Sequence, residues 1–258
     1  MPLALPSVSL IASALPLGGS SHAGVLDDHL LLNLWVAAAL LGGAHLMLLA
    51  GLLRSRKDPP DKEGPESRAR LWRLEFLPLL LLTVLFGYLA ARAQQLWAQS
   101  RYTGAEPSAM QVEVTGVQFA WYFRYPGEDA VFGVIKPALI AAGEGNPLGL
   151  DPSDPHGADD LVSSELVLPA GREVDLRLRA QDVIHGFFLP EMRLKQNALP
   201  GETVHVHFTP ERPGTYAILC TQLCGLGHYR MAATLRVVPQ QEFRAWIRAA
   251  EQAREQKP

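Results

Sequence analysis

The sequence contains little charge and almost no cysteine. Asp, Glu, Lys and Arg make up 19% of its 258 residues, below the roughly 25% of an average soluble protein, whereas hydrophobic residues make up 48%. Only two cysteines are present, which excludes a disulfide framework and leaves one bridge, or a metal or redox site. The formal net charge of −3 lacks the basic excess of nucleic-acid-binding proteins, and we exclude that class.

Positive charge is absent from the beginning of the chain, where no Lys or Arg precedes Arg54. Residues 30–53 contain no charged side chain at all. About 20 apolar residues suffice to cross the hydrocarbon core of a membrane, so this run predicts a transmembrane helix. Residues 74–93 contain a second apolar run, with Glu75 and Pro78 near its start, and predict a second one. Helices this uniformly apolar are rare in soluble domains.

The loop 54–73 between the two predicted spans is rich in Lys and Arg, as is typical of cytoplasmic loops. The hairpin 30–93 then places the N-terminal segment 1–29 and everything after Arg101 outside the cytoplasm. We therefore predict a two-pass protein of a bacterial inner membrane with a periplasmic C-terminal domain. The N-terminal segment is apolar like a signal peptide but has no basic n-region, so its processing is left open.

Residues 101–239 show short alternating runs separated by Pro-Gly turns, as in 173–178 and 203–208. Regular turns between such runs predict an all-β sandwich or Greek-key barrel. The stretch 132–160 is rich in Gly, Pro and Asp without periodicity and is predicted to be a loop insertion. Residues 240–258 have apolar residues at helical spacing and predict a C-terminal amphipathic helix packed on the domain.

The strongest chemical signal is the pair Cys220 and Cys224, followed by His228 and Met231. Two thiolates on one turn can face one centre. Thiolate, imidazole and thioether together favour copper over zinc or magnesium. His185, at the end of a predicted strand and before an apolar turn, is the best candidate for a further ligand from another strand.

The number of cysteines bears on the kind of site. A single copper bound by one Cys, two His and one Met would be a blue-copper site, which needs one thiolate. Two cysteines favour two copper ions bridged by both sulfurs, an arrangement that shares one electron and suits an electron relay. A Cys220–Cys224 disulfide is the structural alternative.

Three other histidines have weaker signals. His205 and His207 alternate along one strand and so share a face, where two imidazoles can bind a metal. Since the sequence offers no third ligand, we predict a solvent-facing pair. His156 has no partner in its loop and is predicted to be solvated.

With these residues the chain resembles subunit II of the haem–copper oxidases, specifically cytochrome c oxidase subunit II with its CuA centre. The resemblance covers roughly residues 30–238. Its most specific part is His185 followed 35 residues later by Cys-x-x-x-Cys-Gly-x-x-His-x-x-Met, and the segments 182–185, 194–201 and 212–216 are also similar. It implies an N-terminal two-helix transmembrane hairpin and a C-terminal cupredoxin-like Greek-key β-sandwich.

The resemblance also implies a binuclear copper site. Its ligands would be the bridging thiolates of Cys220 and Cys224, one imidazole for each copper from His185 and His228, the weakly bound thioether of Met231, and the main-chain carbonyl of Gln222. The family has Glu at the position of Gln222 and Asp at that of Asn197. Because both changes remove a carboxylate, we do not predict the magnesium site to which that Glu contributes in the family.

The family receives electrons at an aromatic cluster whose first Trp faces cytochrome c. Phe119 stands at that position here, and Trp121 matches the next aromatic residue. We therefore predict that electrons enter through Phe119, Trp121 or Tyr122.

The implied function is that of the electron-accepting subunit of a respiratory haem–copper oxidase, a proton-translocating oxidoreductase. Electrons would pass from a periplasmic cytochrome c or similar donor through CuA to haem in subunit I, where oxygen is reduced to water. Subunits I and III, the donor and the lipid membrane are the implied partners. The chain itself would hold no haem, since it has no Cys-x-x-Cys-His motif.

Three other protein classes compete with this interpretation. A quinol oxidase subunit II lacks copper, so the cysteines and histidines argue against it. A membrane-tethered copper carrier would favour exposed, exchangeable Met- or Cys-rich sites. A nitrous-oxide reductase also contains CuA but needs a large additional catalytic domain.

Overall fold

The computed structural model describes residues 15–55 and 65–255. The predicted processing of the first residues, the middle of the basic loop and the last three residues lie outside these ranges. The chain divides into two compact units, one of Val25–Gln99 and one that combines Met1–Gly24 with Ser100–Pro258. Each unit is described by itself.

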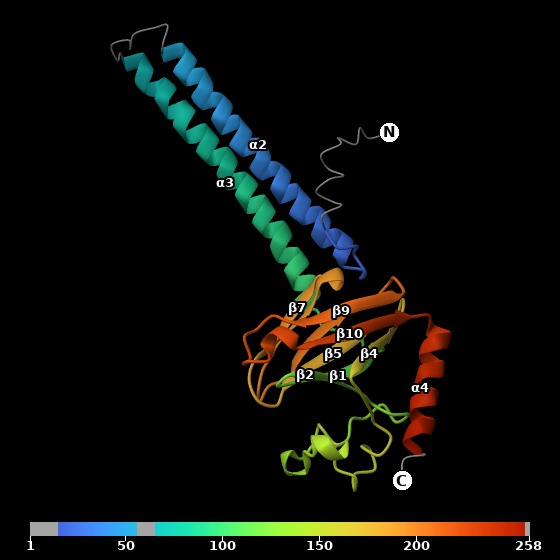
Figure 1. Cartoon of the computed structure of the whole chain (residues 1–258). Helices are drawn as coiled ribbons and strands as arrows, with labels where there is room; N and C mark the ends of the chain where they lie inside the picture. The colour runs from blue at the N-terminus through green and yellow to red at the C-terminus, as the bar shows by residue number, and fades with distance from the viewer. Residues whose placement is uncertain (1–14, 56–64, 256–258) are drawn as a thin grey trace. The chain divides into compact units, whose positions relative to one another are not determined.

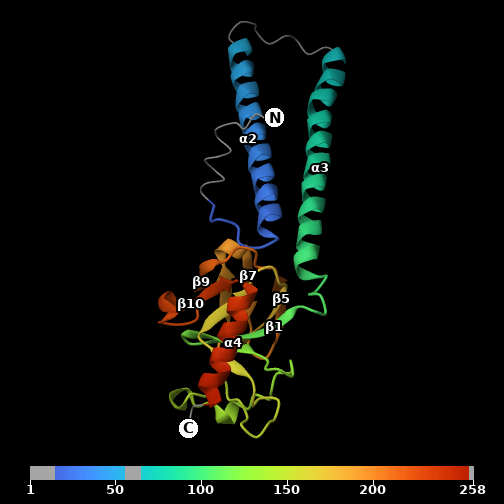
Figure 2. The same ribbon diagram turned by 90° about the vertical axis from the view of Figure 1, so that its right-hand side faces the viewer.

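The first unit consists of two long helices, α2 (Ala23–Ser55) and α3 (Pro65–Arg101), shown in Figures 1 and 2. The windows Ala23–Arg54 and Glu75–Arg101 are long and apolar enough to cross a membrane, and 0% of either window is buried within the chain. Both helices extend beyond the predicted spans, and α3 begins inside the loop predicted at 54–73. The apolar run marks the part in lipid, while helix-forming residues on either side continue the helix.

The second unit is a β-sandwich of two five-stranded sheets, with strand orders β3-β2-β1-β5-β8 and β4-β10-β9-β6-β7. The predicted all-β domain is confirmed. Its strands are β1 (Met110–Val117), β2 (Ala120–Tyr125), β3 (Leu161–Ser163), β4 (Glu165–Pro169), β5 (Val174–Ala180), β6 (His185–Leu189), β7 (Leu194–Ala198), β8 (Val204–Phe208), β9 (Gly214–Cys220) and β10 (Ala232–Val238).

The sandwich core is formed by the alternating positions that the sequence predicts. In β8, Val206 and Phe208 are each 2% exposed, whereas His205 between the inward positions is exposed. Burying such side chains contributes about 1.5–3 kcal/mol each to folding. Strands β6 and β9 pair antiparallel in the second sheet, with Phe187 opposite Cys220. This pairing brings the start of β6 close to the end of β9.

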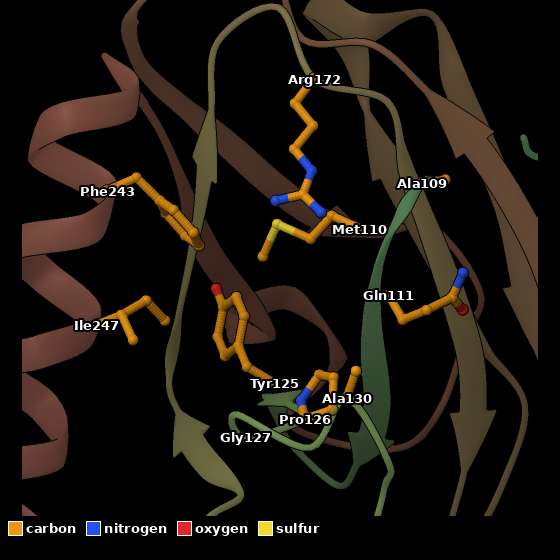
Figure 3. A pocket seen from close by; sticks show the side chains of 10 residues that line it. All are labelled: Ala109, Met110, Gln111, Tyr125, Pro126, Gly127, Ala130, Arg172, Phe243 and Ile247. Atoms are coloured by element: carbon orange, nitrogen blue, oxygen red, sulfur yellow. The ribbon is translucent and has the colours of Figure 1, made fainter. Parts of the chain in front are cut away.

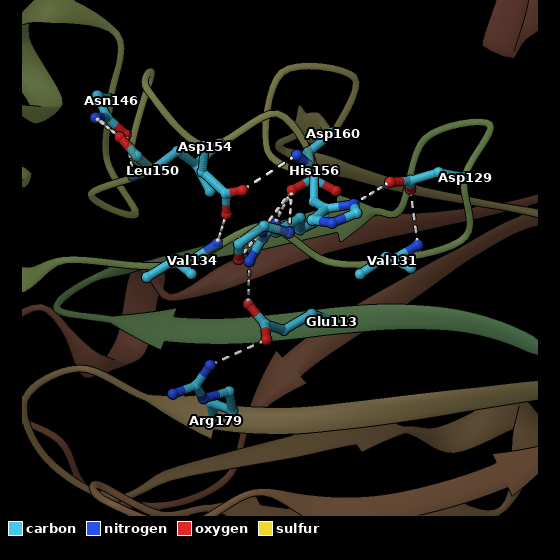
Figure 4. A network of polar contacts seen from close by, with 12 residues as sticks. Glu113, Asp129, Val131, Val134, Asn146, Leu150, Asp154, His156, Asp160 and Arg179 are labelled. Carbon is cyan, nitrogen blue, oxygen red and sulfur yellow. Dashed lines mark hydrogen bonds and ion pairs between the residues drawn. The ribbon is translucent and has the colours of Figure 1, made fainter.

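The insertion 132–160 is ordered in the structure and contains two short helices, η1 (Pro137–Leu139) and η2 (Ala142–Glu144). Buried charges connect its two ends to the sheet: Arg124 of β2 hydrogen-bonds to the Asp160 carboxylate and the Gly133 carbonyl. Figure 4 shows Asp160 in the insertion above Glu113, which pairs with Arg179 at 3.1 Å. The insertion therefore covers the outer face of β1 and β2.

At the other end of the chain, α4 (Gln240–Glu255) is amphipathic as expected. Phe243 is 6% exposed, and the ring of Trp246 lies 5.1 Å from that of Tyr125, edge to face. The helix therefore adds an apolar layer to the domain.

His156, which the sequence predicts to be solvated, is paired within the insertion: its Nδ1 lies 2.6 Å from Asp129 Oδ2. This hydrogen bond is the main cause that raises the pKa of His156 and lowers that of Asp129. The stabilisation by His156 is therefore complete below its ordinary pKa of 6.5, while Asp129 stays ionised, and is lost as the pH rises through the raised value.

We expect Asp129→Asn to lower the pKa of His156 towards its ordinary value, because the main stabiliser of the imidazolium is removed. An NMR titration of the histidine ring protons measures this shift, and exposed His205 serves as the internal control. An unchanged His156 titration would show that the pair does not form in solution.

Candidate metal centre

Two strands and a loop bring the predicted metal ligands together. His185 is the first residue of β6 and Cys220 is the last residue of β9. These two residues and Cys224 each place one ligand atom within 4.8 Å of the others. Since β6 and β9 are neighbours in the sheet, the ligand contributed by a distant part of the sequence arrives beside the two cysteines.

The remaining predicted ligands surround the two sulfurs. Both cysteines are free, and their Sγ atoms lie 3.9 Å apart, well beyond the ~2.05 Å of a disulfide bond. Cys224 Sγ lies 3.6 Å from His228 Nδ1 and 3.7 Å from Met231 Sδ. Cys220 Sγ lies 3.3 Å from the carbonyl oxygen of Gln222. All six residues predicted from the sequence therefore meet at one place.

His185 presents the nitrogen that a metal would need. Its side chain is fully buried, and its Nε2 lies 2.8 Å from Asp182 Oδ1. When Nε2–H donates to this carboxylate, Nδ1 keeps its lone pair, the arrangement of metal-binding histidines in proteins. Nδ1 is buried and has no hydrogen-bond partner in the part of the chain that the structure describes. This orphaned acceptor fits a bound metal ion.

Asp182 is held in place from several sides. Its Oδ2 accepts a hydrogen bond from the Gln118 main-chain N–H at 2.7 Å, and its Oδ1 accepts one from Val183. Desolvation opposes its ionisation, but the hydrogen bonds from His185, Gln118 and Val183 outweigh desolvation and lower the pKa of Asp182. The sequence analysis includes this residue only within the similar segment 182–185 and gives it no role, although an Asp three positions before a candidate ligand His is a usable signal.

Burial also raises the pKa of the second thiol, that of Cys224. Cys224 is 4% exposed, and desolvation, followed by the charge of the Cys220 thiolate and a hydrogen bond with it, raises the pKa of Cys224 to about 11. Without a cation the two sulfurs would therefore not both be ionised at neutral pH. A metal ion binding here would displace protons, as metal binding to cysteine usually does.

The loop after Cys224 needs glycine because an aromatic ring covers it. A Cβ atom on Gly227 would lie 2.4 Å from Cδ2 of Phe119, so any larger residue there would force the ring or the loop to move. Gly225 has φ +135°, a conformation that suits glycine. Gln118 donates its side-chain N–H to the Cys224 carbonyl, so the segment 118–119 holds the ligand loop in position.

The aromatic residues predicted for electron acceptance lie at different depths. Trp121 is 2% exposed, and its ring lies 5.8 Å from that of His185 and 5.2 Å from that of Phe187. The Trp121 ring lies in the core, so electron entry through Trp121, which stays a prediction, would have to reach it through the side chains that cover it. Phe119 is 39% exposed and Tyr122 is partly buried.

The sequence analysis also missed the apolar surface around the ligand loop. Leu223, Leu226 and Tyr229 are 82%, 97% and 79% exposed. All three lie among the ligands in the sequence, so their spacing gave no sign that they would point outward. In the same loop, the ring of Phe119 lies against Gly225 and Gly227.

A separate cavity of about 270 Å³ lies between α4 and the first sheet. Arg172, Met110 and Tyr125 border it, and Phe243 and Ile247 of α4 face it from the other side (Figure 3). None of its lining residues belongs to the sulfur and imidazole cluster, so it is not part of the metal centre.

A β-sandwich with a buried cluster of thiols, imidazoles and a thioether, following two apolar helices, defines a membrane-anchored, cupredoxin-like metal-binding protein. Residues 110–238 match the family described as cytochrome C oxidase subunit II, periplasmic domain. The chain belongs to this family.

Several known proteins are similar to this chain. The alternative cytochrome c oxidase subunit 2 of Bradyrhizobium diazoefficiens is 32% identical over 87% of this chain and 79% of its own length. Cytochrome c oxidase subunit 2 of Thermostichus vulcanus is 34% identical over 53% of this chain, which spans only 32% of that relative. The crystal structure of the periplasmic domain of cytochrome oxidase subunit II from Bradyrhizobium japonicum is 25% identical, covers 57% of this chain and 97% of its own, and has a TM-score of 0.43.

The chain is thus a subunit II of a haem–copper terminal oxidase, an oxidoreductase. As a member of this copper-binding family it is membrane-anchored, carries an extracytoplasmic domain and has subunit I as its partner.

Proposed function

We propose that this chain accepts electrons from a periplasmic cytochrome c, or a similar small donor, and passes them through a binuclear copper centre to haem in subunit I. There oxygen would be reduced to water with proton translocation. The proposal places the protein in a bacterial inner membrane, with the β-sandwich in the periplasm and subunit III as a further neighbour. It rests on the family and on the arrangement of the ligand atoms.

The observation that carries the proposal is the pair of free sulfurs 3.9 Å apart, each with different additional donors. His228 and Met231 lie beside Cys224, and the Gln222 carbonyl lies beside Cys220. A single copper would need only one thiolate. The residues that would hold two copper ions are Cys220 and Cys224 as bridges, with His185, His228, Met231 and the Gln222 carbonyl as terminal ligands.

A pair of copper ions that shares one electron supplies one-electron transfer with little change in geometry. The chain's own residues keep that change small. Asp182 fixes the ring and tautomer of His185, and Gln118 connects the Asp182 carboxylate to the carbonyl of Cys224. Ligand side chains locked by hydrogen bonds in this way cannot easily reorient when the charge of the centre changes.

Burial argues against the alternative of a copper carrier. His185 is 0%, Cys224 4% and Met231 2% exposed, so an acceptor protein could not reach these three ligands without opening the domain. A carrier needs exchangeable ligands. The buried cluster favours a permanently bound cofactor.

Gln222 and Asn197 stand where the family has Glu and Asp, and their amides provide no carboxylate for a magnesium ion. Asn197 lies in β7 opposite Gly186 of β6, next to the strand position of His185. We therefore leave magnesium out of the proposal.

The test is to load the purified full chain with copper in detergent and to measure copper content and the electron paramagnetic resonance spectrum. We expect two copper ions per chain and a hyperfine pattern from one electron shared by two equivalent nuclei. One copper with a four-line signal would favour a mononuclear blue-copper site, and the absence of tight copper would favour a copper-free subunit. Either result would overturn the binuclear assignment.

A further inference from the structure

A second pair of imidazoles lies at the open edge of the first sheet, away from the cysteines. Strand β8 is the edge strand, and the segment before α2 is bound to the chain just beyond it. Ser20 forms an isolated bridge with Pro210, and the Ser21 N–H donates to the Thr209 carbonyl at 3.0 Å. The next residue, His22, is thereby fixed beside His207.

The two rings lie close to the separation that a shared metal ion requires. Their centroids are 6.2 Å apart with an interplanar angle of 87°. A Zn²⁺ ion about 2.0–2.1 Å from each nitrogen lies roughly 3.2 Å from each ring centre, so two rings on one tetrahedral ion have centres ~5–6 Å apart. A shift of about an ångström or less closes the difference.

The hydrogen bonds of His207 are those of a typical metal-binding histidine. Its Nδ1 lies 2.9 Å from Glu173 Oε1, and its side chain is 10% exposed. Nε2 is buried and has no hydrogen-bond partner among the residues that the structure describes. A buried polar nitrogen without a partner is costly, and a carboxylate on the opposite nitrogen is the usual companion of a metal-bound histidine. The predicted solvent-facing pair of His205 and His207 is therefore wrong for His207.

The burial of His22 favours its neutral, metal-binding form. Desolvation, and then the neighbouring His207, lower the pKa of His22, while Glu173 and Glu211 act in the opposite direction. A neutral imidazole is the form that binds metal ions. The two carboxylates provide negative potential at the same place.

We propose that His22 and His207 bind one divalent transition-metal ion of the Zn²⁺ type, with water completing the coordination. Among described residues, three ligand atoms within 4.8 Å occur only at the cysteine centre, so the new site offers two protein ligands. It is independent of the copper centre, because β8 belongs to the first sheet whereas β6 and β9 belong to the second. A bound ion would join the segment preceding α2 to the edge of the sandwich.

The experiment titrates Zn²⁺ into the copper-loaded full chain in detergent, followed by isothermal calorimetry. The wild type should take up one Zn²⁺ without loss of the copper absorption. His22→Gln and His207→Gln should each weaken binding by roughly tenfold or more, and Glu173→Gln by about 10–100-fold, the usual effect of losing a carboxylate behind a ligand. X-ray absorption at the zinc edge should show two imidazoles in the wild type.

The matched control is His205→Gln. His205 lies on the same strand and face and also pairs with a carboxylate, Asp175, but its side chain is 55% exposed, and no other imidazole of the described residues stacks against it. Its loss should leave zinc affinity unchanged. Equal affinity in all variants, or no zinc uptake by the wild type, would overturn the proposal. His22→Gln keeps the test decisive even if His207→Gln fails to fold, because His22 lies outside the sandwich strands.

Discussion

Replacing Cys224 by Ser should reduce the copper content from two ions per chain to one or none and abolish the shared-electron spectrum. Cys224 lies within 4 Å of three other sulfur or nitrogen donors, so no other residue can take over its position. A serine oxygen is a harder and poorer ligand for copper than a thiolate. We expect electron transfer to oxygen to fall by more than about 100-fold, beyond the 10–100-fold typical of groups that merely support a ligand.

The control for this variant is Met231→Leu. Leucine fills a similar volume and keeps the buried packing, but it removes the thioether whose Sδ lies 3.7 Å from Cys224 Sγ. Because thioether is the weakest of the proposed ligands, we expect two copper ions to remain and the reduction potential to shift. Copper analysis, the spectrum and a redox titration distinguish the two variants. Two copper ions and an unchanged spectrum in Cys224→Ser would refute the binuclear centre.

The sequence predicts the ligand cluster well because most of its chemistry is local. Cys220, Cys224, His228 and Met231 lie on one loop and its flanks, where spacing alone limits how far the side chains can separate. His185 comes from another strand; its place at the end of a predicted strand makes it a candidate, and the family pattern connects it to this loop. The role of its partner Asp182 was missed because a hydrogen bond that fixes a tautomer leaves no periodic signal in a sequence.

Burial predicted from the sequence was wrong where a distant segment covers a strand face that the alternating pattern predicts to be exposed. Arg124 follows the buried Phe123 in β2 and is itself 1% exposed, because the insertion 132–160 covers that side of the sheet. His207 is buried in the same way through the segment that contains His22. Alternation of apolar and polar residues along a strand identifies the face that packs on the core. It does not show whether another segment covers the opposite face.

The apolar runs had a related limit. They predict which part of a helix suits lipid, since hydropathy measures transfer from water. They contain no information on where the helix hydrogen bonds begin or end. This is why α2 starts at Ala23 and α3 at Pro65, both before the predicted spans.

Of the substitutions proposed here, Arg124→Met should cause the largest loss in the free energy of unfolding of the β-sandwich domain. The Arg124 guanidinium bonds to Asp160, whose side chain is 0% exposed, and lies 3.5 Å from Glu113, which is 5% exposed. Methionine would leave both carboxylates buried without this partner, and breaking a buried pair on one side costs about 3–5 kcal/mol. For a domain of this size we expect a fall in Tm of roughly 6–20 °C, measured by circular dichroism of the full chain in detergent.

The pH dependence separates this cause from a simple loss of packing. Burial is the main factor that raises the pKa of Asp160, while Arg124 and the Gly133 N–H oppose it. Without Arg124 the pKa should rise further, so Asp160 can take up a proton in mildly acidic solution and the penalty of Arg124→Met should shrink as the pH falls. Glu242→Gln, which breaks the exposed pair with Arg236, should cost at most about 1 kcal/mol. A penalty for Arg124→Met that is equally small, or that does not change with pH, would show that the buried carboxylates find other partners.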